Sequence, residues 1–129
     1  MIHFTSVLTR HCFQAVDLEY NQLTQSLENT DKIDLDSVVS SHRAFLLGLT
    51  QKVMFAGGDQ SLFVSILSIL TCIVSFEKVV CDALNMEEEI LVVQESKSSF
   101  DGRVGLLLKA LHEQGYGDLA AKLDFNEVF

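Results

Sequence analysis

The stretch DLDSVVSSHRAFLLGLTQKVMFAGG, residues 34–58, constrains the fold most, because it carries the signals that begin, continue and end one helix. Asp34 can cap the helix, since its carboxylate accepts hydrogen bonds from first-turn amides, and Asp36 adds negative charge where the helix dipole favours it. Apolar side chains and one histidine then recur at steps of three and four residues. They are Leu35, Val38, Val39, His42, Phe45, Leu46, Leu49 and Val53. Gly57 and Gly58 tolerate the left-handed conformation that closes a helix, so we expect the helix to end there.

The composition indicates an all-α protein. A chain of 129 residues fits one domain with a core, and 48% of the residues are apolar. The absence of proline leaves nothing to forbid long helices. We therefore predict a single helical domain over residues 1–129.

Helical spacing recurs on both sides of this stretch. Residues 2–28 form an amphipathic pattern, and the polar segment 29–33 is short enough to make the two flanking helices antiparallel neighbours. Residues 60–84 form a third and very apolar pattern. The spacing therefore predicts three consecutive helices.

The C-terminal part carries one long helix and one short one. The long pattern begins at Phe100 and stops at Gly115, and residues 118–123 add a short helix. Residues 85–99 stay unassigned, because their apolar run fits a helical turn or a short strand. The predicted fold is thus an antiparallel bundle of four main helices plus a short C-terminal helix. Gly102 and Gly105 inside the long helix suggest close approach to a neighbour.

The segment 60–76 carries no charge and is just long enough to span a bilayer. Serines recur along one of its faces, however, at Ser61, Ser65, Ser68 and Ser75. A central bundle helix needs apolar contacts on most sides and one small or wet face. We therefore expect a buried helix of a soluble bundle and no membrane partner, with a transmembrane helix as the alternative.

Charge and cysteine content exclude several classes of function. The net charge is −9, and the nine basic residues are scattered singly, so no site for a nucleic acid backbone is expected. Three cysteines without metal-ligand spacing, Cys12, Cys72 and Cys81, read as buried thiols in a reducing compartment. The N-terminus lacks the pattern of a secretory signal.

No catalytic, cofactor or metal site is expected. The four histidines are His3, His11, His42 and His112, and none has a ligand partner at helical spacing. His42 lies on the apolar stripe, so we assign it a packing role. Asp34 and Asp36 point apart on a helix, which suits capping better than acid–base catalysis. No motif of a phosphate-binding loop, a hydrolase or a metalloprotease occurs, so the chain is not expected to be an enzyme.

Three blocks of sequence, in order, resemble the gamma-tubulin complex component family. The central block resembles the pattern D-(L/F)-D-x-h-h-x-x-H-x-x-(F/Y)-L, where h is apolar. Its matching residues are Asp34, Leu35, Asp36, Val38, Val39, His42, Phe45 and Leu46. The entry segment from MIHF to Tyr20-x-x-Leu23 is similar to the family's, with Tyr20 in place of the usual tryptophan. The ending Leu123-Asp124-Phe125-Asn126 is similar to the family's C-terminal pattern.

This resemblance implies the C-terminal part of the helical domain that binds gamma-tubulin directly. The implied function is a scaffold that contributes to microtubule nucleation at microtubule-organising centres, the centrosome or spindle pole. Its partners would be gamma-tubulin and other gamma-tubulin complex components. Arg43, Lys52 and Asn126 are the exposed residues we select as candidate contacts.

Family members are several times longer, so we expect a fragment, a short isoform, a truncated product or a small paralogue. Two other functions stay open. One is a generic helical adaptor that binds a partner helix. The other is a membrane-associated helical protein anchored by residues 61–76.

Overall fold

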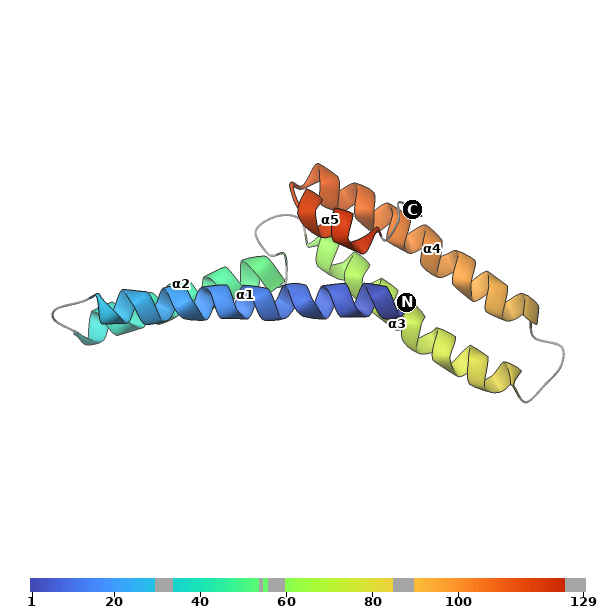
Figure 1. Ribbon diagram of the computed structural model, residues 1–129, viewed down its shortest axis with the longest axis horizontal. Helices are drawn as coiled ribbons and strands as arrows, with labels where there is room; N and C mark the ends of the chain where they lie inside the picture. Colours follow the sequence, from blue (N-terminus) through green and yellow to red (C-terminus); the bar gives the residue numbers. More distant parts are fainter. Residues whose placement is uncertain (30–33, 54, 56–59, 85–89, 125–129) are drawn as a thin grey trace. The chain divides into compact units, whose positions relative to one another are not determined.

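The computed structural model describes residues 1–29, 34–53, 55, 60–84 and 90–124. Its helices are α1 (Ile2–Glu28), α2 (Leu35–Val53), α3 (Ser61–Ala83), α4 (Ile90–Glu113) and α5 (Gly117–Leu123). Figure 1 shows α2 running antiparallel to α1, and α4 running antiparallel to α3. The described residues form no strand, which confirms the prediction of an all-α fold with four main helices and a short last one.

Contacts divide the chain into two compact units. One unit comprises Met1–Thr5 with Ser61–Phe129, and the other comprises Ser6–Gln60. Each unit has its own helix pair, α3–α4 in the first and α1–α2 in the second. A single domain over residues 1–129 stays a prediction.

The first unit holds the larger apolar core. α3 packs against α4, and α5 packs against α4. The buried side chains are Phe4, Leu62, Ile66, Ile69, Phe100, Val104, Leu107, Leu108, Leu111, Leu119, Ala120 and Leu123. The rings of Phe4 and Phe100 meet edge to face at 6.0 Å. The Arg103 guanidinium donates to the Ser68 carbonyl at 3.2 Å, which ties the serine face of α3 to α4.

The two glycines inside α4 do not mark a close approach. A Cβ atom at Gly102 or Gly105 would have nothing within 4 Å, so the prediction of tight packing there is wrong. The residues of α4 that face the core are instead Phe100, Val104, Leu107, Leu108 and Leu111. Both glycines lie away from that stripe.

Helix ends follow the sequence signals at three of the five clearest positions. Asp34 caps α2, since the Ser37 amide donates to its Oδ1 at 2.7 Å. Gly115 ends α4 with φ at 86°, and the Tyr116 amide donates to the Leu111 carbonyl at 2.8 Å. This arrangement is a Schellman motif, in which glycine takes the left-handed position. α1 ends at Glu28, as predicted.

Two boundaries differ from the predicted ones. α2 ends at Val53, before the glycine pair, and Phe55 has a positive φ of 55°. Gly57 and Gly58 lie outside the described residues. α4 begins at Ile90, ten residues before Phe100, so the unassigned apolar run is helical.

The second unit is a two-helix hairpin with few buried residues. Among its described residues only Ala15, Glu19 and Phe55 are buried. None lies in α2. The apolar stripe of α2 is therefore only partly covered, with Phe45 and Leu49 half-buried.

Candidate protein-binding face

The contact line between α1 and α2 contains one ion pair with a buried carboxylate. Glu19 of α1 is buried, and its carboxylate accepts a hydrogen bond from the Lys52 ammonium of α2. Gly48 of α2 lies directly against that carboxylate, and a Cβ atom there would collide with it. The absence of a side chain at Gly48 therefore leaves the space that Glu19 occupies.

The end of α2 is held by a histidine from α1. His11 donates from Nε2 to the Lys52 carbonyl at 3.0 Å. Its ring also stacks on that of Phe55, with centroids 5.7 Å apart and planes 7° from parallel. Because the last carbonyls of a helix lack intrahelical partners, His11 satisfies one of them from the neighbouring helix. Lys52 is thus bound through both its side chain and its backbone.

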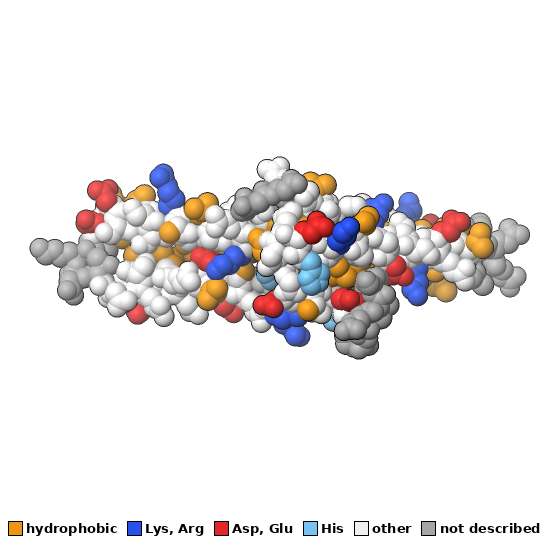
Figure 2. Space-filling view, turned by 90° about the horizontal axis from the view of Figure 1, so that it is seen from above, with side chains coloured by type: hydrophobic (Ala, Val, Ile, Leu, Met, Phe, Trp, Pro, Cys, Tyr) orange, Lys and Arg blue, Asp and Glu red, His pale blue; other side chains and the backbone are white. Residues whose placement is uncertain are grey.

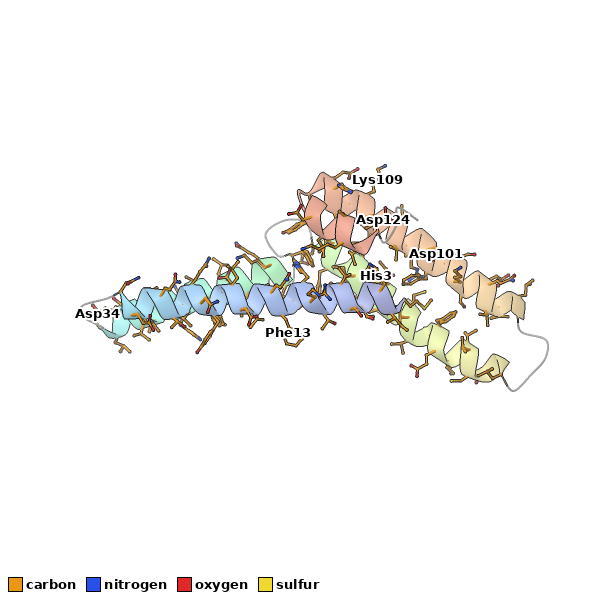
Figure 3. All side chains as sticks on the ribbon, viewed as in Figure 1. His3, Phe13, Asp34, Asp101, Lys109 and Asp124 are labelled. Atoms are coloured by element: carbon orange, nitrogen blue, oxygen red, sulfur yellow. The ribbon has the colours of Figure 1, made fainter. Side chains whose placement is uncertain are left out.

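A set of exposed residues forms one face of this hairpin, which we call the hairpin face. It consists of Phe13, Val16 and Tyr20 of α1 and Leu35, Val39, His42 and Leu46 of α2. Figure 3 shows Phe13 pointing away from the α1 ribbon. All seven residues belong to the blocks that resemble the family, the three from α1 to the entry block and the four from α2 to the central block.

The α1 residues and the α2 residues of the hairpin face lie on the same side of the hairpin. Val16 and Tyr20 directly follow Ala15 and Glu19, which lie on the contact line with α2. Leu46 likewise follows Phe45, which together with Glu19 lines the groove between the helices. Each residue is rotated by about 100° around the helix axis relative to the one before it. In an antiparallel pair, residues that directly follow the contact line therefore lie on the same side of both helices.

A groove of about 410 Å³ lies between α1 and α2. Its lining residues are Glu19, Gln22, Leu23, Ser26, Ser40, Ser41, Ala44 and Phe45. Most are small or polar, and its one carboxylate is the one that accepts from Lys52. The groove is thus chemically unlike the hairpin face.

The packing role predicted for His42 is wrong. His42 is exposed, and its ring lies 6.4 Å from that of Phe45 in the next turn of the same helix. The stripe that contains it is wider than the line a single neighbouring helix can cover, because an amphipathic stripe spans 100° or more of the helix surface. The uncovered part of the stripe becomes the hairpin face. Leu46 is exposed for the same reason.

The candidate contact residues have different surroundings. Arg43 is exposed at the edge of the hairpin face, as expected. Lys52 is not a freely exposed contact, because its ammonium binds Glu19 and its side chain is 39% exposed. Asn126 and Phe125 lie outside the described residues. The two other C-terminal pattern residues, Leu123 and Asp124, are buried and half-buried in the first unit.

Asp34 and Asp36 are both exposed in the first turn of α2. Hydrogen bonds from the Ser37 side chain and backbone hold the pKa of Asp34 below its usual value. This is the behaviour of a capping carboxylate and not of a general acid. Figure 3 places Asp34 at the tip of the α1–α2 hairpin.

The described part of the chain holds no metal cluster, and the face seen in Figure 2 carries no basic patch. No group of three metal-ligating side chains occurs there. Figure 2 shows Lys and Arg side chains scattered singly over one face. The thiols are less buried than predicted, since Cys12 and Cys72 are half-buried and Cys81 is exposed. Burial raises the pKa of the Cys12 thiol.

α3 is less buried than predicted. Among the described side chains of this helix only Leu62, Ile66 and Ile69 are buried, while Val64 and Val74 are exposed. The segment Ser61–Asp82 has a mean hydropathy of 2.0, and by length and composition it could cross a membrane. Only 11% of that apolar window is buried. The prediction of a central, enclosed helix is therefore wrong, because only one side of α3 meets α4.

Sequence reasoning did not single out Glu19 and Gly48. A signal was available for both, since Glu19 is a carboxylate at apolar spacing from Ala15 and Leu23, and Gly48 is a glycine inside a strong helical pattern. Neither signal identifies the other residue. Only the antiparallel pairing of the two helices brings them together.

The described helices define an all-α protein in which the hairpin of α1 and α2 leaves an apolar face exposed. The whole chain, residues 1–129, matches the family described as gamma tubulin complex component C-terminal, and it belongs to that family. No curated protein matches the chain. No solved structure matches it either.

Membership of this family associates the chain with the gamma-tubulin complex, microtubule nucleation and the cytoskeleton. Proteins of the family are structural scaffold components. The resemblance found in the sequence is thereby confirmed over the full length.

Proposed function

We propose that this chain binds gamma-tubulin directly and acts as a scaffold subunit, or as part of one, in microtubule nucleation. The family match over residues 1–129 carries this proposal. The chain would act by positioning gamma-tubulin next to other gamma-tubulin complex components, without bond chemistry. We place it at microtubule-organising centres, the centrosome or the spindle pole.

The test of binding is a pull-down of gamma-tubulin by the purified chain. A competent surface retains gamma-tubulin at micromolar concentration, which corresponds to roughly 8 kcal/mol of binding free energy. No retention at that concentration would reject direct binding by this segment.

Arg43 is our candidate contact on the described surface, with Asn126 as a second candidate in the tail. Arg43 is exposed and carries a guanidinium, which binds carboxylates in a bidentate manner. Arg43→Glu should weaken retention of gamma-tubulin at least roughly tenfold if Arg43 meets an acidic partner surface. Lys97→Glu on α4 makes the same change of charge at another exposed position and should leave retention near the parent value.

Membrane association is a second candidate, favoured by the exposed apolar residues of α3. The helix is long enough to reach across a bilayer, and Val64, Leu67 and Val74 are exposed on it. Recovery of the chain in the detergent phase of a phase separation would support this function. Recovery in the aqueous phase together with retention of gamma-tubulin would reject it in favour of the scaffold.

A further inference from the structure

The hairpin face leaves a large apolar area without a covering partner in its unit. The exposed fractions are 66% for Phe13, 41% for Val16, 60% for Tyr20, 78% for Leu35, 52% for Val39 and 48% for Leu46. Aromatic side chains offer about 150–250 Å² each, and Val or Leu side chains about 60–120 Å² each, so these six expose on the order of 450 Å². A standard protein interface takes about 800 Å² from each partner. The six apolar side chains therefore supply about half of that area, and the charged residues around them can supply more of it.

The charges at the edges of this face are of both signs. Arg10, Asp17 and Glu28 lie on the outer edge of α1, and Asp36 and Arg43 lie on the outer edge of α2. A partner with charge of one sign only would meet like charges at some of these positions. A partner whose edge also carries charges of both signs can place opposite charges at these positions.

A second copy of the chain has such an edge. Arg10 and Glu28 are eighteen residues apart, which is five helical turns, so both lie on the same edge of α1. When two copies of α1 cross antiparallel and are centred on the turn around Glu19, Arg10 of each copy comes opposite Glu28 of the other. The twofold arrangement forms this pair twice.

We propose that the hairpin face is a homodimer interface, through which two copies of the chain pack α1–α2 against α1–α2. Each copy then covers the apolar residues that its own unit leaves exposed. The result is a four-helix arrangement with Phe13, Val16 and Tyr20 in its interior. This inference is independent of gamma-tubulin binding, because it is tested on the chain alone.

Sedimentation of the purified full chain over a range of concentrations tests the proposal. We expect a monomer–dimer equilibrium. Tyr20→Glu and Leu46→Glu should each weaken dimerisation roughly tenfold or more, since a carboxylate would be buried in an apolar interface. The matched control is Leu106→Glu, at an α4 position that is 72% exposed, which should leave dimerisation unchanged. Circular dichroism checks that all three variants keep their helices.

A charge swap tests the antiparallel arrangement. Arg10→Glu and Glu28→Arg should each weaken the dimer, and the double variant should restore it, because the swap recreates both pairs with reversed sign. A chain that stays monomeric to about 100 μM, or a Leu106→Glu variant that dissociates as much as Tyr20→Glu, would overturn the proposal.

Discussion

At the scale of single residues, a polar cluster fixes the pairing of α1 with α2. Glu19 is the one charged residue among the buried described residues, and its partner Lys52 comes from the other helix. Breaking such a pair by removing one member leaves a buried charge uncompensated, which is more destabilising than the pair itself is stabilising. The position of Gly48 against Glu19 therefore matters more than its low helix propensity.

Gly48→Ala should destabilise the chain. Alanine gains about 1 kcal/mol of helix propensity over glycine, but its Cβ atom would displace the Glu19 carboxylate from Lys52. We expect a net loss of about 1–2 kcal/mol in the free energy of unfolding, measured by urea titration with circular dichroism.

The control for this prediction is the same substitution in a Glu19→Ala background. There the carboxylate is gone, so Gly48→Ala should become stabilising by up to about 1 kcal/mol. A destabilising effect of equal size in both backgrounds would show that the collision with Glu19 is not its cause.

Asp34 should make the stability of the second unit sensitive to acid. Its pKa in the folded chain lies below the usual value of 3.8, chiefly because of the hydrogen bond from the Ser37 side chain. The stabilisation is therefore fully present above the unfolded pKa and is lost as the pH falls through the folded pKa. We expect Asp34→Asn, which still caps but does not titrate, to lose less stability in acid than the parent chain.

Urea midpoints recorded as the pH is lowered from neutral towards about 2 measure this effect. Asp34→Ala is the matched control, because it lacks an acceptor and should be less stable than Asp34→Asn at neutral pH as well. Parallel acid curves for the parent and Asp34→Asn would contradict the assignment of the lowered pKa to this cap.

At the scale of helices, periodicity predicted which segments are helical, and local signals predicted several of their ends. Asp34 and Gly115 acted as cap and stop because those signals depend on the nearest few residues only. The end of α2 at Val53 was missed, since one of its last carbonyls, that of Lys52, is satisfied by His11 from another helix. Burial was the least predictable property. An apolar stripe gives the side of a helix that can be covered, whereas coverage depends on how many helices pack there.

Glycine substitutions in and after α4 should have opposite effects. Gly115→Ala should destabilise the chain by roughly 1–2 kcal/mol, because Gly115 has φ at 86°, a left-handed conformation that is unfavourable for alanine. A Cβ atom at Gly102 meets nothing within 4 Å in a helical position, so Gly102→Ala should stabilise by up to about 1 kcal/mol. Urea unfolding of both variants measures the difference, and a shift in the same direction for both would contradict the role of Gly115 as the helix stop.

At the scale of the whole molecule, the two units differ in how much they bury. The unit with α3, α4 and α5 contains most of the buried apolar side chains, whereas the α1–α2 unit contains Ala15, Glu19 and Phe55 among its described residues. Most of the stability of a helix in a protein comes from packing of its apolar face. The α1–α2 hairpin should therefore open more easily by itself, and a partner on the hairpin face should stabilise it.

Hydrogen exchange measured by mass spectrometry tests this difference within one sample. At a concentration of about 1 μM, we expect the amides of α2 to exchange at least roughly tenfold faster than those of α4 between Phe100 and Leu111, because local opening of α2 exposes little apolar surface. Raising the concentration should slow exchange in α2 and leave α4 unchanged, as dimerisation covers the hairpin face. Tyr20→Glu should remove that dependence on concentration. Equal protection of α2 and α4 in dilute solution would contradict the argument that burial within the α1–α2 unit sets its stability.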